Sequence, residues 1–152
     1  MDTEQLLNIA EVEVSYTSRY PPEERPTIRL SADAFNILKQ VWNDKTIEYQ
    51  EEFWILLLNR SKHVLGAYQL SKGGICGVTV DIRIIFTVAL QSSSCCILLA
   101  HNHPSGQLNP SQADIELTKR ISRAGDILDI KVLDHIILTR DHYYSFTDEG
   151  LL

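Results

Sequence analysis

The sequence predicts an α/β fold in which a single mixed β-sheet is flanked by about three helices. Two observations predict it: apolar runs of strand length recur along the chain, and segments with apolar residues at helical spacing separate them. The 152 residues are 44% hydrophobic, which is enough for one substantial core and too little for two. We therefore expect one domain over residues 28–152, preceded by a variable lead-in over 1–27.

The first half of the chain predicts one helix and two strands. The acidic lead-in contains Tyr20-Pro21-Pro22, and Ser31 is the expected N-cap of a first helix that runs to about Thr46. Strands are expected at 53–59 and 63–71, before the break at Gly73-Gly74. The apolar residues of the first helix share one face, at Phe35, Leu38, Val41 and Trp42.

The second half predicts two helices and three strands. Asp81 is the expected cap of a second helix, and the run 95–100 has no polar alternation, as expected of a strand covered on both faces. Ser111 opens a third helix. Strands at 131–139 and 143–146 are expected to close the chain as a hairpin around Arg140-Asp141.

A potential metal site follows the central strand, at His101-Asn102-His103-Pro104. Side chains two apart on an extended chain point to the same side, so His101 and His103 can converge on one ion while Asn102 faces away. Asp114 lies in the first turn of the third helix. Two imidazoles and one carboxylate would leave a fourth position for water, which is typical of catalytic zinc.

Simpler interpretations of these residues remain open. Ser111-Gln112-Ala113-Asp114 is also a variant of the capping box, which by itself explains both polar residues. Histidines two apart also occur as surface residues of a loop. Elsewhere, His63 and His142 lie in turn-like segments, and His135 in an apolar strand is expected to be a satisfied core or near-site histidine.

The spacing His101-x-His103-Pro104, then Ser111-x-x-Asp114, resembles the metalloprotease signature of the JAMM/MPN family. The local sequence from His101 to Gly106 resembles the RadC branch in particular. The likeness continues through 133–137 and 143–146, so it covers roughly Glu51 to the C-terminus. Chains of that branch commonly carry a helical DNA-binding-type region before the metal domain, and we expect this chain to be a short form without it.

The resemblance implies a JAMM/MPN, cytidine-deaminase-like architecture and a Zn²⁺ ion on His101, His103 and Asp114. It also implies that Ser111 helps to stabilise the oxyanion and that an upstream glutamate is the general base. Both Glu51 and Glu52 stand before the strand at 53–59, and only one of them can face the metal. We prefer Glu52, because it directly precedes Phe53, and keep Glu51 and a solvated role for both as alternatives.

The implied activity is that of a zinc-dependent peptidase or isopeptidase acting on a protein or peptide. The alternatives are a DNA-repair-associated protein that binds or processes nucleic acid, and a non-catalytic MPN scaffold. Nucleic acid is not favoured as a partner, because the formal net charge is −6 and no basic stripe is present. Lys119, Arg120 and Arg123 at helical spacing are expected to form a solvated face.

The remaining features predict a cytoplasmic protein. The hydrophobic stretches are too short to cross a membrane, and residues 1–10 lack the pattern of a secretory leader. Cys76, Cys95 and Cys96 show no CxxC spacing, so we expect structural thiols in a reducing compartment. The oligomeric state is left open.

Overall fold

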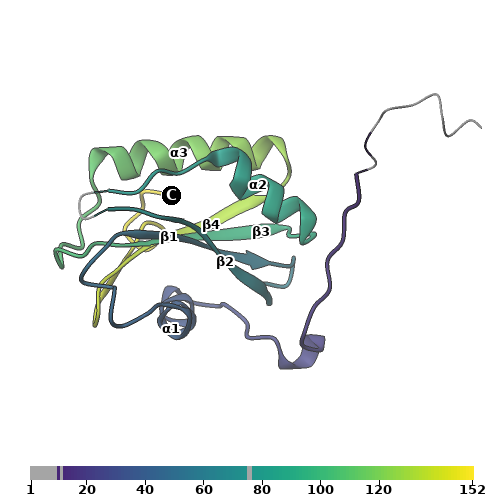
Figure 1. Cartoon of the computed structure of the whole chain (residues 1–152), viewed down its shortest axis with the longest axis horizontal. Helices are drawn as coiled ribbons and strands as arrows, with labels where there is room; N and C mark the ends of the chain where they lie inside the picture. Colours follow the sequence, from purple (N-terminus) through teal and green to yellow (C-terminus); the bar gives the residue numbers. More distant parts are fainter. Residues whose placement is uncertain (1–9, 11, 75–76) are drawn as a thin grey trace, which may run out of the picture.

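A five-stranded mixed sheet forms the centre of the protein, with the strands in the order β2-β1-β3-β4-β5 (Figure 1). The computed structural model describes residues 10, 12–74 and 77–152. Strands β3 and β4 run parallel, and the other neighbours are antiparallel. The strands are β1 (Glu52–Leu58), β2 (Val64–Lys72), β3 (Cys96–Asn102), β4 (Lys131–Leu138) and β5 (Tyr143–Ser145).

Three α-helices cover the two faces of this sheet. Helix α1 (Ser31–Val41) packs on one face, and helices α2 (Ile82–Gln91) and α3 (Gln112–Ile127) lie on the other (Figure 1). A short 3₁₀ helix at Pro22–Glu24 precedes α1. The predicted α/β architecture, a mixed sheet with about three helices, is confirmed.

Strand β1 shows how the sheet divides the core. Phe53, Ile55 and Leu57 point into the core beneath α2 and α3, whereas Leu56 and Leu58 point into the core beneath α1. Strand β1 pairs with β3 in a register that sets Phe53 opposite His101. Directly opposed residues share a face, so His101 lies on the side of the sheet that carries α2 and α3.

The first helix is shorter than predicted. It ends at Val41, and Trp42 is extended, although the Trp42 side chain is buried as its apolar spacing suggested. The Asn43 side chain accepts a hydrogen bond from the Lys45 backbone N–H (2.9 Å), so a local turn replaces the next helical turn. The N-cap is Leu30 rather than Ser31, and the Asp33 carboxylate accepts the Leu30 N–H instead.

Other predicted boundaries need small changes. Asp81 caps α2 as expected, because its carboxylate accepts the Arg83 N–H at 2.9 Å.

Cys95 is exposed immediately before β3, and Cys96 is half-buried, so this pair is less enclosed than the sequence suggested. Cys76 lies outside the described residues. Within the part of the chain that the structure describes, no helix is long and apolar enough to span a membrane.

Candidate metal centre

His101, His103 and Asp114 come together at one end of the sheet. His101 lies near the end of β3, His103 follows that strand, and Asp114 is in the first turn of α3. The two imidazole Nε2 atoms are 3.0 Å apart. The Asp114 carboxylate lies 3.4 Å from Nε2 of His101 and 3.6 Å from Nε2 of His103. These three side chains form a group that could hold one metal ion, with one ligand atom each, all within 4.8 Å of one another.

The capping interaction and the ligand cluster coexist at Asp114. Its Oδ2 accepts hydrogen bonds from the Ser111 N–H and the Ser111 hydroxyl, both at 2.7 Å. The Ser111 Oγ in turn accepts the Asp114 N–H at 3.1 Å, which completes a capping box. The second carboxylate oxygen, Oδ1, is the one nearest His101. The cap therefore fixes the carboxylate in the orientation that a ligand needs.

In its neutral form, His103 presents an unprotonated nitrogen to this cluster. Its Nδ1 lies 2.7 Å from the carbonyl oxygen of Gln107, which can only accept a hydrogen bond. Nδ1 therefore carries the proton, and a neutral ring keeps its lone pair on Nε2. The loop can return to the imidazole because Gly106 adopts φ 81°, a left-handed conformation that suits glycine.

The donor set fits zinc. Two imidazole nitrogens and one carboxylate are ligands that zinc takes in hydrolytic sites, and three protein ligands leave room for one more. The electrostatics agree with a cluster that holds positive charge. Contact with Asp114 raises the pKa of His103. Burial raises the pKa of Asp114, but the hydrogen-bonding contacts with the two imidazoles outweigh burial and hold its pKa well below the usual range.

A buried imidazole, that of His135, contacts the ring nitrogen of His101 that faces away from the cluster. His135 on β4 is fully buried, and its Nε2 lies 2.7 Å from Nδ1 of His101. On its other side, Nδ1 lies 2.6 Å from the hydroxyl oxygen of Thr118 in α3. Burial lowers the pKa of His135 well below its ordinary value, so the ring is neutral. The expected near-site position of His135 is observed, whereas sequence reasoning did not single out Thr118, whose only signal was its helical spacing from Asp114.

The two candidate glutamates point in different directions. Glu52 is 3% exposed, and its carboxylate accepts hydrogen bonds from Thr46, Trp54 and Gln69. Trp54 belongs to the core on the α1 face, opposite the face that carries the cluster. Glu52 therefore does not face His101, contrary to our preference from the sequence.

Glu51 is the glutamate beside the cluster. It is half-buried, and burial raises the pKa of its carboxyl, while electrostatic interaction with His101 and His103 opposes that rise. Its backbone is held by Gly73 and Gly74, with the Gly73 N–H donating to the Glu51 carbonyl at 2.8 Å. The Phe53–His101 pairing and this electrostatic coupling thus place Glu51 on the ligand side of the sheet and Glu52 on the other side.

The Asn102 side chain holds the backbone segment that leads to these two glutamates. The side chain is fully buried and faces away from the ligands, as predicted. Its Oδ1 accepts the Glu52 N–H at 2.7 Å, and its amide donates to the carbonyls of Ile47 and Gln50. Asn102, which lies between the two histidines, therefore ties the segment that carries Glu51 to the end of β3, where His101 lies.

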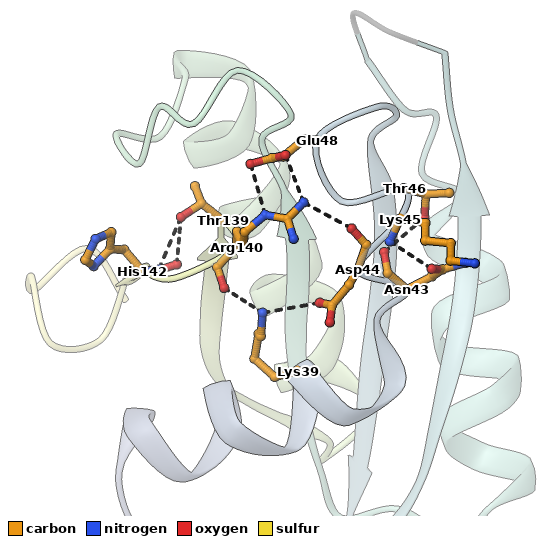
Figure 2. Close-up of polar contacts among 9 residues, drawn as sticks. All are labelled: Lys39, Asn43, Asp44, Lys45, Thr46, Glu48, Thr139, Arg140 and His142. Atoms are coloured by element: carbon orange, nitrogen blue, oxygen red, sulfur yellow. Dashed lines mark hydrogen bonds and ion pairs between the residues drawn. The ribbon is translucent and has the colours of Figure 1, made fainter.

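Surface contacts hold the same segment from outside. The Arg140 guanidinium makes two hydrogen bonds to the Glu48 carboxylate and one to the carbonyl of Asp44 (Figure 2). The Lys39 ammonium group donates hydrogen bonds to the Asp44 carboxylate and to the Arg140 carbonyl (Figure 2). Glu48 and Arg140 also line a cleft of about 270 Å³ that reaches His103. His142 lies in this cleft, outside the ligand cluster.

The comparisons with known proteins identify the family of this chain. The model of the RadC-like JAB domain matches residues 28–151. The chain belongs to the RadC family. The JAB domain assigns this RadC protein to the JAMM/MPN superfamily, whose members are often metal-dependent hydrolases.

Relatives of this RadC chain include proteins named UPF0758. One from Flavobacterium johnsoniae is 51% identical over 124 residues, which are 82% of this chain and 53% of that protein. One from Porphyromonas gingivalis is 39% identical over 88% of this chain and 60% of its own length. The chain thus spans between about half and 60% of these relatives. Their name states no reaction, so the activity has to be inferred from the site.

Proposed function

We propose that this protein is a zinc-dependent metallohydrolase that cleaves peptide or isopeptide bonds. The observation that carries the proposal is the convergence of His101, His103 and Asp114, with Glu51 beside them on the same face. Three ligands and one adjacent carboxylate are a set that supports metal-assisted hydrolysis. His101, His103 and Asp114 would hold the ion.

An ion held there would supply Lewis acidity, which would lower the pKa of a water molecule to about 7 and polarise a scissile carbonyl. Glu51 accepts a proton from the attacking water and passes it to the leaving amine, which requires a carboxylate within reach of both groups. The raised pKa of Glu51 suits this exchange, because a base works best when its pKa is near the operating pH. The Ser111 N–H and hydroxyl keep the Asp114 carboxylate in its ligand orientation.

A role for Ser111 as an oxyanion donor competes with this cap. Its hydroxyl proton is engaged by Asp114 at 2.7 Å, so it is not free to bind a developing oxyanion in this arrangement. We propose that the serine acts mainly by positioning the carboxylate.

Charge supports a protein substrate over nucleic acid. The formal net charge is −6, whereas binding to a phosphate backbone relies on clustered lysines and arginines. Arg140, which borders the cleft next to His103, is already paired with Glu48. A cytoplasmic location is proposed as well, because Cys95 and Cys96 are free thiols and free thiols are typical of reducing compartments.

The test combines metal analysis with an activity assay. Purified protein should contain about one zinc per chain by mass spectrometry of the metal, and His103→Ala should lose it. Glu51→Gln should keep the zinc but lose cleavage of a panel of peptide and isopeptide substrates. His142→Ala, which changes a histidine outside the cluster, is the matched control and should keep its metal. Stoichiometric zinc in His103→Ala, or full activity in Glu51→Gln, would overturn the assignment.

A further inference from the structure

A continuous series of buried hydrogen bonds joins two of the three candidate ligands, His101 and Asp114. It runs from His101 to His135 (2.7 Å), from His135 to Thr118 (2.6 Å), and from the Thr118 hydroxyl to the backbone carbonyl of Asp114 (2.6 Å). His101, His135 and Thr118 are each no more than 1% exposed. Water therefore does not compete for these bonds.

The direction of every bond in this series follows from its last acceptor. A backbone carbonyl can only accept, so the single proton of the Thr118 hydroxyl is directed at the carbonyl of Asp114. The Thr118 oxygen must then accept from Nδ1–H of His135. A neutral imidazole has one proton, which leaves Nε2 of His135 as an acceptor for Nδ1–H of His101.

These bond directions also determine which nitrogen His101 presents to the cluster. With its proton on Nδ1, a neutral His101 has its lone pair on Nε2, the atom that lies 3.0 Å from Nε2 of His103 and 3.4 Å from the Asp114 carboxylate. Without this constraint, half of the possible ring states would present an N–H and could not bind a metal. The hydrogen bonds of the protein therefore select the tautomer that can bind a metal.

Packing holds the ring of His135 in the required plane. Phe146 stacks on it with ring centroids 4.7 Å apart, and Phe53 meets it edge-on at 5.6 Å. The imidazole cannot turn its nitrogens away from His101 and Thr118 without displacing one of these rings.

We propose that His135 and Thr118 are positioning residues that set the tautomer of His101, so that the backbone of one ligand, Asp114, prepares the side chain of another. This inference rests on the proposed metal function, since it assigns the two residues a part in ligand binding. Outer partners of this kind typically change metal affinity by 10–100-fold when they are removed. Thr118 couples the helix that carries Asp114 to the strands that carry both imidazoles.

Two pairs of variants test the proposal. Thr118→Val keeps the shape of the side chain but removes the hydroxyl, and Thr118→Ser keeps the hydroxyl as its matched control. His135→Phe removes both nitrogens, whereas His135→Gln offers an amide oxygen that can accept from His101. Zinc affinity is measured by competition with a chromophoric chelator, and the melting temperature of the metal-free protein reports on the fold.

The expected result is a zinc affinity that is 10–100-fold weaker in Thr118→Val and His135→Phe. Thr118→Ser and His135→Gln should stay closer to the wild type than their partners do. If His135→Phe does not fold, the Thr118 pair carries the test. Unchanged affinity in a folded Thr118→Val protein would overturn the positioning role while leaving the zinc site intact. A wild-type protein that binds no zinc would overturn the metal function and this inference together.

A spectroscopic readout separates positioning from a loss of packing. Long-range proton–nitrogen NMR correlations distinguish Nδ1–H from Nε2–H imidazoles, and both His101 and His135 should be Nδ1–H in wild type and Thr118→Ser. In metal-free Thr118→Val, the His135 tautomer should become mixed, because Nδ1 has lost its acceptor. An Nε2–H proton on His135 in the wild-type protein would contradict the inferred direction.

Discussion

Glu51 and Glu52 are neighbours in the chain, but the start of β1 turns their side chains to opposite faces of the sheet. Glu51 lies two residues before Phe53, which pairs opposite His101, so alternation directs it to the face of His101; burial raises the pKa of its carboxyl. Glu52 is enclosed on the other face, where Trp54 and Gln69 donate to its carboxylate at 3.0 Å and 2.7 Å. Under the proposed function, two adjacent residues of one type therefore have separable roles, Glu51 in the chemistry and Glu52 in the stability of the fold.

Alanine substitutions should separate these roles. Glu51→Ala should lower kcat by about 10²–10⁴-fold, the usual contribution of a general base, with little change in melting temperature. Glu52→Ala should lower the free energy of unfolding by about 1–3 kcal/mol, because buried donors lose their acceptor. Urea unfolding and turnover measured on both proteins check the prediction. Equal loss of activity with equal loss of stability in both variants would contradict it.

The sequence predicts the residues of the site whose geometry is local. His101 and His103 share a side because strand side chains alternate, and Asp114 faces them from the first turn of a helix. The choice between Glu51 and Glu52 depends on where the strand begins and how it pairs, and the β1–β2 register shifts between Phe53 and Trp54. Local spacing does not encode such a shift.

Thr118 illustrates a second limit of local reasoning. Its contact with His135 depends on how α3 packs against β4, which brings together residues 17 positions apart. A threonine on the buried side of an amphipathic helix looks like an ordinary core residue in the sequence. Its role becomes visible only when the imidazole on β4 lies beside it.

At the scale of elements, the fold was predictable where the hydrophobic pattern was continuous. The apolar runs predicted the bounds of β1 and β3 to within two residues at each end, because both strands are covered on both faces. The predicted end of α1 was wrong. Trp42 fits the helical spacing and its side chain is buried, but its backbone is extended. The turn that Asn43 starts competes with the helix, and a periodicity argument does not weigh that competition.

Asp134 joins β4 to β5 and the turn that follows. Its carboxylate accepts the N–H groups of His135 (2.7 Å) and Thr147 (3.0 Å), as well as the Ser145 hydroxyl (2.6 Å). Burial nonetheless raises its pKa above the ordinary value of 3.8. The folded protein therefore holds the proton of Asp134 more tightly than the unfolded chain does.

This shift predicts a pH dependence of stability. A raised carboxyl pKa favours the fold below pH 3.8, and that contribution is lost as the pH rises through the folded-state pKa. Asp134→Asn has no such titration, so its free energy of unfolding should gain on that of wild type across the same interval and then stay level. Urea unfolding of both proteins between pH 3 and pH 8 measures the difference. A wild type that gains on the variant as the pH rises would contradict the sign.

For the whole molecule, the candidate ligands link the sheet to one helix layer. His101 and His103 belong to β3 and its exit, and Asp114 belongs to α3. An ion bound by all three would cross-link these layers, whereas α1 on the opposite face would not contact it. Metal binding should therefore stabilise the complete fold, because the unfolded chain lacks the site.

Metal removal should lower the melting temperature. Zinc at about 100 times its Kd contributes about 2.7 kcal/mol to the free energy of unfolding, which corresponds to several degrees for a chain of this size. Differential scanning calorimetry before and after chelation measures the shift, and added zinc should reverse it. His103→Ala is the control and should melt at the same temperature with and without chelator. A wild-type melting temperature that ignores the chelator would contradict the prediction.

The position of β3 between β1 and β4 has a consequence for how the site opens. The backbone of β3 is paired on both sides, so freeing the strand requires two sets of ladder bonds to break in a single cooperative event. Residues 43–50 are anchored to the tip of the β4–β5 hairpin by surface contacts such as that of Arg140 with Glu48. The histidine side of the candidate site thus rests on backbone pairing that opens only cooperatively, whereas the segment leading to Glu51 is held by side-chain contacts, so the spacing of the histidines should outlast local fluctuations of that segment.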